Sequence, residues 1–406
     1  MSGTTRHGGR WTQDDRCASP WHYLPVEVPA GTAGLRVELD YDRSSAVLDL
    51  GCFGPAGFRG WSGGARSSFV ITPREATPGY LPGELEPGLW QVVLGLYRLP
   101  AAGVGYSVTA SVSTIPGRLR PDPPAPLPAL LRERPPRREL PARAGHRWLA
   151  GDLHAHTVHS DGAFSVAELA RFAAAQGLDF LAVTDHNTTS HHAELKDAAA
   201  RYGITLLPGQ EVTTEDGHAN ALGDVGWIDF RERPDHWLDT TEQRGGLLSV
   251  NHPIGGHVSW IWPMRRRPPL AEVWHWSWLD PHWTNMLAWW LAWDPAAVAV
   301  GGSDWHRPGA DATPGTPTTW VECAGEGPGA VLDGLRAGRC SISARRDGPV
   351  LLRRDGELVA VGADGTLLAG RDGPRAVVRG DLAVFPAADG YHRLLDFTGA
   401  TLALTG

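Results

Sequence analysis

Residues 148–162 read WLAGDLHAHTVHSDG, a short apolar run that ends in two histidines and an aspartate. His154 and His156 are spaced i, i+2, which on a strand places both rings on one face. A second run, LDFLAVTDH at 178–186, is continuous and apolar and ends in an Asp-His pair. The two runs predict buried parallel strands whose carboxyl ends carry polar side chains.

Helical patterns alternate with these runs. Ser165 and Glu168 form a capping box at the head of a helix expected over 165–176, and Gly177 ends it. A second helix is expected over 191–202. Further short apolar runs follow at 204–212, 217–225, 245–253, 270–276, 298–306 and 316–323. About six or seven strand–helix units favour a parallel barrel over an open sheet.

The flanking regions have different residue patterns, and these patterns set the predicted domain boundaries. Residues 20–115 alternate apolar and polar positions between Gly/Pro-rich breaks, and they predict a β-sandwich domain over 1–115. Residues 116–145 hold nine prolines and seven arginines and are expected to be a linker. The barrel is assigned to 146–345. Asp-Gly dipeptides between short apolar runs predict a β-hairpin segment over 346–406.

The length and composition of the chain exclude several classes of protein. A chain of 406 residues predicts two or three domains, and 42% hydrophobic with 20% charged residues excludes wholesale disorder. A net charge of −8 does not argue for a nucleic-acid polymer as partner. No apolar run approaches the roughly 18 residues that span a membrane.

The expected compartment is the cytoplasm. The first residues lack the apolar core of a secretory signal. The four cysteines form no close pair and no CxxC motif, which agrees with reduced thiols, although a Cys17–Cys52 bridge stays open.

Histidines and carboxylates recur where the predicted strands end. The candidate metal ligands are His154, His156, Asp161, His186, Glu211, His218, His252, Asp304 and His306. The carboxyl ends of barrel strands converge on one rim, so these side chains are expected to face a common point. Buried carboxylates repel each other without a cation, and mixed imidazole and carboxylate ligands suit Mn, Zn or Fe. Because the set is too large for one ion, we expect two or three divalent transition-metal ions.

Other residues near these strand ends are expected to play lesser parts. Asp185 is expected to orient a ligand rather than to touch a metal. His159, His191 and His192 are expected to be surface or loop residues.

The motifs DLHAHTVHSDG, VTDHN, PGQEV, SVNHP and GGSDWH resemble those of the polymerase and histidinol phosphatase (PHP) superfamily. The resemblance covers residues 148 to about 345 and is closest to the carbaryl-hydrolase-like branch, whose members often carry an N-terminal β-sandwich. It implies an α/β protein with a distorted (β/α)7 barrel, an N-terminal β-sandwich and a small C-terminal β-rich segment.

The resemblance also implies how the ligands are divided. One metal position is matched by His154, His156, Glu211 and Asp304. Glu211 bridges to a second position that His218 also holds. The remaining position is matched by Asp161, His186, His252 and His306. Many family members have His where this chain has Asp161, and an oxygen ligand there is expected to weaken the third site or to favour Mn or Fe. Glu211, Asp304 and His218 are the expected catalytic residues.

Three functions compete. The first is a phosphoesterase in which a metal-bridging hydroxide attacks a small phosphoester. The second uses the same site to cleave a carbamate, ester or amide. The third is a non-catalytic binding protein, which the complete ligand set argues against.

The tryptophans between Trp260 and Trp293 bear on this choice. Nine of them are interleaved with three consecutive arginines. Core packing or a subunit interface is the alternative role for this segment, so a homo-oligomer stays open. Aromatic walls suit a planar group and arginines suit phosphate, so a small aromatic or nucleotide-like phosphoester ranks first. The candidate substrate contacts are Asn220, His257, Trp260, Arg265, Trp276 and Arg307.

Overall fold

The structure is a computed structural model that describes residues 3–116, 119, 124–127, 133–277, 282, 284–309 and 312–406. The chain forms two compact units. The N-terminal unit comprises Met1–Pro124, Val158–Asp161 and His186–His191. The C-terminal unit comprises Ala125–Thr157, Gly162–Asp185 and His192–Gly406. The boundary thus falls inside the predicted linker, and two short pieces of the predicted barrel region belong to the N-terminal unit.

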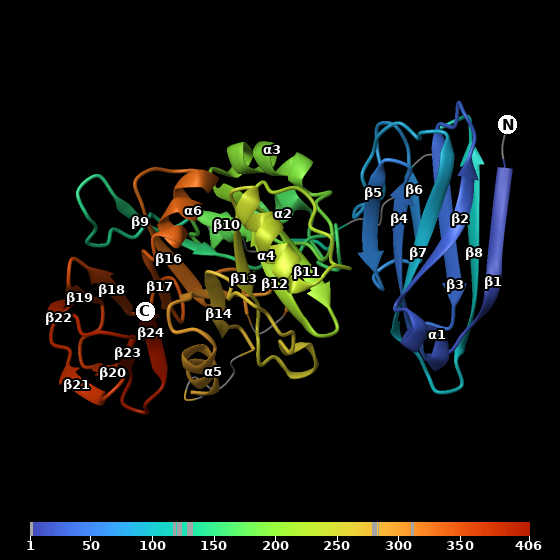
Figure 1. The fold of residues 1–406 in the computed structure, drawn as a ribbon. Helices are drawn as coiled ribbons and strands as arrows, with labels where there is room; N and C mark the ends of the chain where they lie inside the picture. Colours follow the sequence, from blue (N-terminus) through green and yellow to red (C-terminus); the bar gives the residue numbers. More distant parts are fainter. Residues whose placement is uncertain are drawn as a thin grey trace. The chain divides into compact units, whose positions relative to one another are not determined.

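Two antiparallel four-stranded sheets make up most of the N-terminal unit (Figure 1). One contains, in spatial order, β1 (Gly3–Trp11), β8 (Val104–Ser113), β3 (Gly34–Tyr41) and β6 (Ser68–Ile71). The other contains β2 (Trp21–Val28), β7 (Gly88–Arg98), β4 (Val47–Gly54) and β5 (Gly57–Gly63). Alternate residues such as Leu35, Val37 and Leu94 are fully buried in one shared core. The period-two runs therefore correspond to real strands, whereas β1 and the helix α1 (Gln13–Ala18) lie outside any predicted element.

A 13-stranded ladder organises the C-terminal unit. Its first part has the spatial order β15 (Val298–Gly302), β14 (Leu270–His275), β13 (Leu247–Val250), β12 (Gly217–Leu222), β11 (Thr205–Thr214), β10 (Phe180–Val183) and β9 (Arg147–Asp152). It continues through β16 (Thr318–Cys323), β17 (Cys340–Ser343), β24 (Thr401–Thr405), β23 (His392–Leu395), β20 (Leu367–Gly370) and β21 (Gly373–Val377). The predicted strand ends therefore belong to one sheet.

The sheet is mixed, and the structure does not confirm the predicted closed parallel barrel. β9, β10 and β11 run parallel, as do β13, β14 and β15, but β12 is antiparallel to both β11 and β13. The reason is the tight turn between Thr214 and Gly217, which leaves no room for a crossover helix. β12 is buried on both faces, so its apolar pattern resembles that of a parallel strand. Among the described strands β15 does not pair with β9, and one isolated parallel bridge, between Ala155 and Trp305, joins the chain beyond their ends.

Fewer of the connections between strands contain a helix than the alternating pattern predicts. The C-terminal unit contains α2 (Val166–Ala175), α3 (His192–Tyr202), α4 (Pro234–Gln243), the 3-10 turn η1 (Gly256–Val258), α5 (Asn285–Trp293) and α6 (Pro328–Arg336) among its described residues. The predicted capping box is confirmed, since Ser165 Oγ accepts from the Glu168 amide and Glu168 accepts from the Ser165 amide. None of the described helices is long and apolar enough to cross a membrane.

Part of the predicted linker is anchored to the C-terminal unit. Some of 116–145 lies outside the described residues, but its later half contains Arg134 and Arg137, which both contact Asp179. The Arg137 Nε–Asp179 Oδ1 distance is 2.8 Å, and the Asp179 side chain is 4% exposed. The arginines of this segment therefore fix it to the start of β10.

The C-terminal segment shares the sheet of the region before it. β24 pairs with β17, while β18 (Val350–Arg354), β19 (Glu357–Val361) and β22 (Leu382–Pro386) form a separate three-stranded sheet. The Asp355-Gly356 turn joins β18 to β19 as the hairpin signal predicts. All four cysteines are free thiols, so the alternative Cys17–Cys52 bridge is not formed.

Candidate metal centre

The end of β9 is fixed by a buried carboxylate. Asp152 accepts hydrogen bonds from the backbone amides of His154, Ser303 and Gly315, at 3.1, 3.0 and 2.8 Å. These bonds connect the chain after β9 to the chain after β15. Asp152 thereby holds together the two backbone segments that carry His154 and Asp304.

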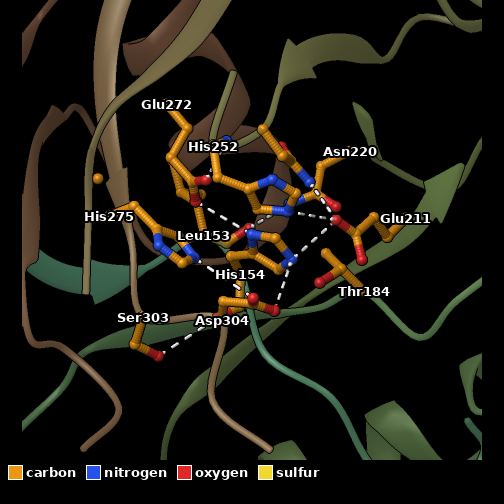
Figure 2. A network of polar contacts seen from close by, with 12 residues as sticks. Leu153, His154, Thr184, Glu211, Asn220, His252, Glu272, His275, Ser303 and Asp304 are labelled. Atoms are coloured by element: carbon orange, nitrogen blue, oxygen red, sulfur yellow. Dashed lines mark hydrogen bonds and ion pairs between the residues drawn. The ribbon is translucent and has the colours of Figure 1, made fainter. Parts of the chain in front are cut away.

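Four predicted ligands converge here: His154, His156 and Asp304 follow β9 and β15, whereas Glu211 lies within β11 and not at its end. His154 Nε2 lies 3.2 Å from both Glu211 Oε1 and Asp304 Oδ1, as Figure 2 shows. His156 Nε2 lies 2.9 Å from Asp304 Oδ1 and 3.5 Å from Glu211 Oε2. One donor atom from each of the four residues lies within 4.8 Å of the others. Three of the side chains are fully buried and that of Asp304 is 19% exposed.

Glu211 also contacts a second group of predicted ligands. Its Oε1 lies 3.2 Å from His218 Nδ1 and 3.4 Å from His252 Nε2, and it accepts a 2.9 Å hydrogen bond from Asn251. The His218 and His252 rings are 4.9 Å apart. His252 therefore lies beside Glu211 and His218, whereas the family resemblance groups it with His306.

His306 contacts both His156 and Asp304. The two rings stack with centroids 4.2 Å apart, and His306 Nδ1 is 3.6 Å from Asp304 Oδ1. Asp161 and His186 belong to the segments of the N-terminal unit, where His186 Nε2 lies 3.7 Å from Asp161 Oδ1. Asp185 accepts from the amide and hydroxyl of Thr157, next to His156, which agrees with the orienting role expected for it.

Two further residues join the cluster from β14. Glu272 Oε1 lies 3.0 Å from His154 Nδ1, and Glu272 Oε2 accepts the backbone amide of His252 at 2.7 Å. His275 Nε2 lies 3.3 Å from Asp304 Oδ2. Sequence reasoning missed both, although His275 is the last residue of its strand and Glu272 is a charge within an apolar run. Applied to 270–276, the strand-end criterion would have found His275.

The charges of the cluster perturb one another. Burial alone would lower the pKa of His154, but the carboxylates of Glu211, Asp304 and Glu272 outweigh it and raise that pKa well above its ordinary value. Burial alone would raise the pKa of Asp304, yet His154, His156 and the neighbouring imidazoles hold it well below its usual range. Histidines and carboxylates therefore lie next to each other in the site, and each favours the charged form of its neighbours.

The residues present fit a divalent transition metal. His154 Nε2 is buried and faces the carboxylates of Glu211 and Asp304, while its Nδ1 faces Glu272. A carboxylate on one imidazole nitrogen that leaves the other for a metal is the usual arrangement around metal-binding histidines. His252 and Asp304 also adopt left-handed backbone angles, with φ of 26° and 46°. Such strain is concentrated at functional sites.

The candidate substrate contacts have different environments. Asn220 is buried, and its amide donates to the carbonyl of Leu153, next to His154. Trp260 is 6% exposed and packs against the rings of Trp237 and Trp293, which agrees with the core-packing alternative. Trp276 is half-buried, with its ring 5.9 Å from that of His275. His257, Arg265 and Arg307 are exposed.

His159 and His191 lie in loops, which is one of the two expected positions, but neither lies on the surface. His159 is 6% exposed and His191 is fully buried, and both belong to the N-terminal unit. Local sequence gives no signal for this burial, because Gly79, which contacts both loops, is far away in the chain.

Comparison with known proteins identifies the domain that holds most of the cluster. Residues 152–271 match the PHP domain family. A 3',5'-nucleoside bisphosphate phosphatase of Chromobacterium violaceum is 47% identical over 66 residues, 16% of this chain and 23% of that protein. A 5'-3' exoribonuclease of Haemophilus influenzae is 44% identical over 63 residues, again 16% of this chain and 23% of that protein. The chain thus spans about a quarter of the length of these relatives.

A solved structure covers more of the chain at lower similarity. It is a two-domain protein from Bacteroides vulgatus described as containing a predicted PHP-like metal-dependent phosphoesterase. It is 17% identical with a TM-score of 0.44, over 67% of this chain and 99% of that one. The family match does not distinguish branches, so the carbaryl-hydrolase-like assignment stays a prediction. The chain contains a PHP domain, at residues 152–271.

Proposed function

We propose that this chain is a metal-dependent phosphoesterase that hydrolyses a small phosphorylated molecule. The observation that carries the proposal is the convergence of imidazole nitrogens and carboxylate oxygens from His154, His156, Glu211 and Asp304 within 4.8 Å. The PHP domain supports the same class of reaction, since the relatives named above are a phosphatase and an exoribonuclease.

The geometry supports a revised division of the ligands. One ion would be held by His154, His156, Glu211 and Asp304. A second would be held by Glu211, His218 and His252, because His252 lies beside Glu211. A third position would take Asp161 and His186, whose Oδ1 and Nε2 atoms lie 3.7 Å apart.

When bound, divalent ions at such a site lower the pKa of a coordinated water and polarise the phosphoryl group. The chain's own residues set the geometry in which this occurs. Glu272 orients His154, and Asn251 holds Glu211 by donating to its Oε1. No serine or cysteine nucleophile is required, and Cys323 and Cys340 are buried in strands β16 and β17.

The proposed substrate is a small aromatic or nucleotide-like phosphoester. Arg307 directly follows His306 and is exposed, so its paired N–H donors can reach a nonbridging phosphate oxygen. Trp276, half-buried beside His275, offers an aromatic face to a planar group. The net charge of −8 favours such a molecule over a nucleic-acid polymer.

The test is a hydrolysis screen of protein loaded with Mn, Zn or Fe(II). We expect turnover of phosphomonoesters or phosphodiesters and none of carbamates or aryl esters. Glu211→Gln should lose bound metal and nearly all turnover together, whereas Glu357→Gln, an exposed change on β19, should lose neither. Turnover of carbamates or esters alone would replace the phosphoester reaction. Less than one metal equivalent after loading would overturn the proposal.

A further inference from the structure

Two short segments of the PHP domain fold with the β-sandwich of the N-terminal unit. They are Val158–Asp161 and His186–His191. In the sequence the first begins two residues after His156 and the second directly follows Asp185. Each carries one predicted metal ligand, Asp161 in the first and His186 in the second.

Arg66, in the loop between β5 and β6, holds the first segment. Its Nη1 donates to the carbonyl of Ser160 at 2.9 Å, and its Nη2 donates to the carbonyl of Val158. A planar guanidinium that binds two carbonyls of one loop fixes the direction of that backbone. Asp161 is the next residue after this anchored stretch.

Gly79 holds the second segment. Its amide donates to Ser190 Oγ at 3.0 Å, and its carbonyl accepts from the Thr188 hydroxyl at 2.9 Å. Gly79 has φ of +99°, and a Cβ added to it would lie 2.8 Å from the His159 carbonyl oxygen. Only glycine allows so close an approach without displacing the backbone.

The two segments are also joined to each other. His159 Nδ1 lies 2.7 Å from Ser190 Oγ, and both side chains are buried. Beyond this link, His186 Nε2 and Asp161 Oδ1 are 3.7 Å apart. The contacts of Arg66 and Gly79 therefore hold the two segments that carry these predicted ligands.

We propose that Arg66 and Gly79 of the N-terminal unit are positioning residues for two predicted metal ligands of the same unit, Asp161 and His186. The inference rests on the proposed function, since it assumes that these two residues hold an ion. The sandwich contributes no ligand of its own. It sets the affinity of the position that Asp161 and His186 serve and leaves the position around His154 unchanged.

The test measures metal binding directly on the full-length protein. Arg66→Met should weaken the binding of one metal equivalent by roughly 10- to 100-fold, the usual effect of losing a residue that orients a ligand. The other equivalents should bind as before. Chelator competition and elemental analysis give these affinities independently of turnover. Arg66→Lys keeps one donor and should restore part of the affinity.

Arg36→Met is the matched control. Arg36 lies exposed on β3, where it pairs with Glu38, and this variant should bind metal like the parent protein. Thr188→Val removes the hydroxyl that donates to Gly79 and should reproduce the Arg66 effect with little change in side-chain size. It provides the test if Arg66→Met fails to fold.

The outcomes separate the two proposals. If the parent protein binds no metal or hydrolyses no phosphoester, the proposed function fails. If the parent binds its ions and both Arg66→Met and Thr188→Val retain every affinity, the sandwich has no positioning role. Uniform weakening of all equivalents would also overturn the inference, because it would reflect general destabilisation.

Discussion

Glu272 shows how one residue outside the predicted set shapes the candidate metal centre. Its carboxylate lies 3.0 Å from His154 Nδ1 and accepts the amide of His252, so it sets the orientation of two predicted ligands. Burial alone would raise the pKa of Glu272, but His154, His275 and His252 outweigh it and lower that pKa. The residue is therefore ionised in its buried position.

Glu272→Gln is expected to reduce metal affinity by roughly 10- to 100-fold, because a neutral amide holds the His154 ring less firmly. Competition with a chromogenic chelator measures this, with Glu357→Gln as the exposed control. Metal affinity equal to that of the parent protein would contradict the orienting role.

The sequence predicts site residues where strand ends supply the signal. His154, His156 and Asp304 follow apolar runs, and the strand termini bring them together. Glu272 lies within such a run and not at its end, so the strand-end criterion does not select it. Buried His159 lies against Gly79, which is 80 residues earlier in the chain, a contact that no local pattern encodes.

At the scale of elements, contacts between arginines of the predicted linker and the buried carboxylate of Asp179 anchor that segment to the C-terminal unit. Asp179 accepts hydrogen bonds from the Ala150 amide at 3.0 Å and from Arg137 at 2.8 Å, with Arg134 at 3.4 Å. The proline content indicates an extended chain, but only the folded partner shows where the arginines bind. In the same way, the antiparallel direction of β12 follows from turn length and not from its apolar pattern.

Asp179→Asn is expected to lower the free energy of unfolding by about 1.5–3 kcal/mol, the usual range for hydrogen bonds to a charged group. Glu326→Gln is the matched control, since Glu326 contacts the same Arg137 but its side chain is 59% exposed. Exposed ion pairs contribute about 0–1 kcal/mol. Urea unfolding of both variants gives the comparison, and equal losses would contradict it.

His392 on β23 provides a pH-dependent contribution to stability. Burial and then the guanidinium groups of Arg353 on β18 and Arg375 on β21 lower its pKa from 6.5 to about 4. The unfolded chain therefore binds a proton between these pH values while the folded chain does not. The free energy of unfolding therefore does not change with the titration of His392 above about pH 6.5, and it decreases as the pH falls from 6.5 toward 4.

His392→Asn should consequently reduce the loss of stability between pH 7 and pH 5. Thermal unfolding of the parent and the variant at both pH values measures the difference. Parallel pH profiles would show that His392 does not titrate as described.

At the scale of the whole molecule, two compact units with separate cores are expected to unfold separately. A metal ion that binds only folded ligands stabilises the unit that holds it. A ligand at about 100 times its dissociation constant stabilises the folded state by about 2.7 kcal/mol. Metal binding of this strength is large enough to raise the temperature of unfolding measurably.

Calorimetry should therefore show that removal of metal by a chelator lowers the temperature at which the metal-loaded protein unfolds. Arg66→Met should reduce this shift, because Arg66 then no longer anchors the backbone before Asp161. Arg36→Met should behave like the parent protein. An unfolding temperature that chelation leaves unchanged would contradict metal binding by the folded protein.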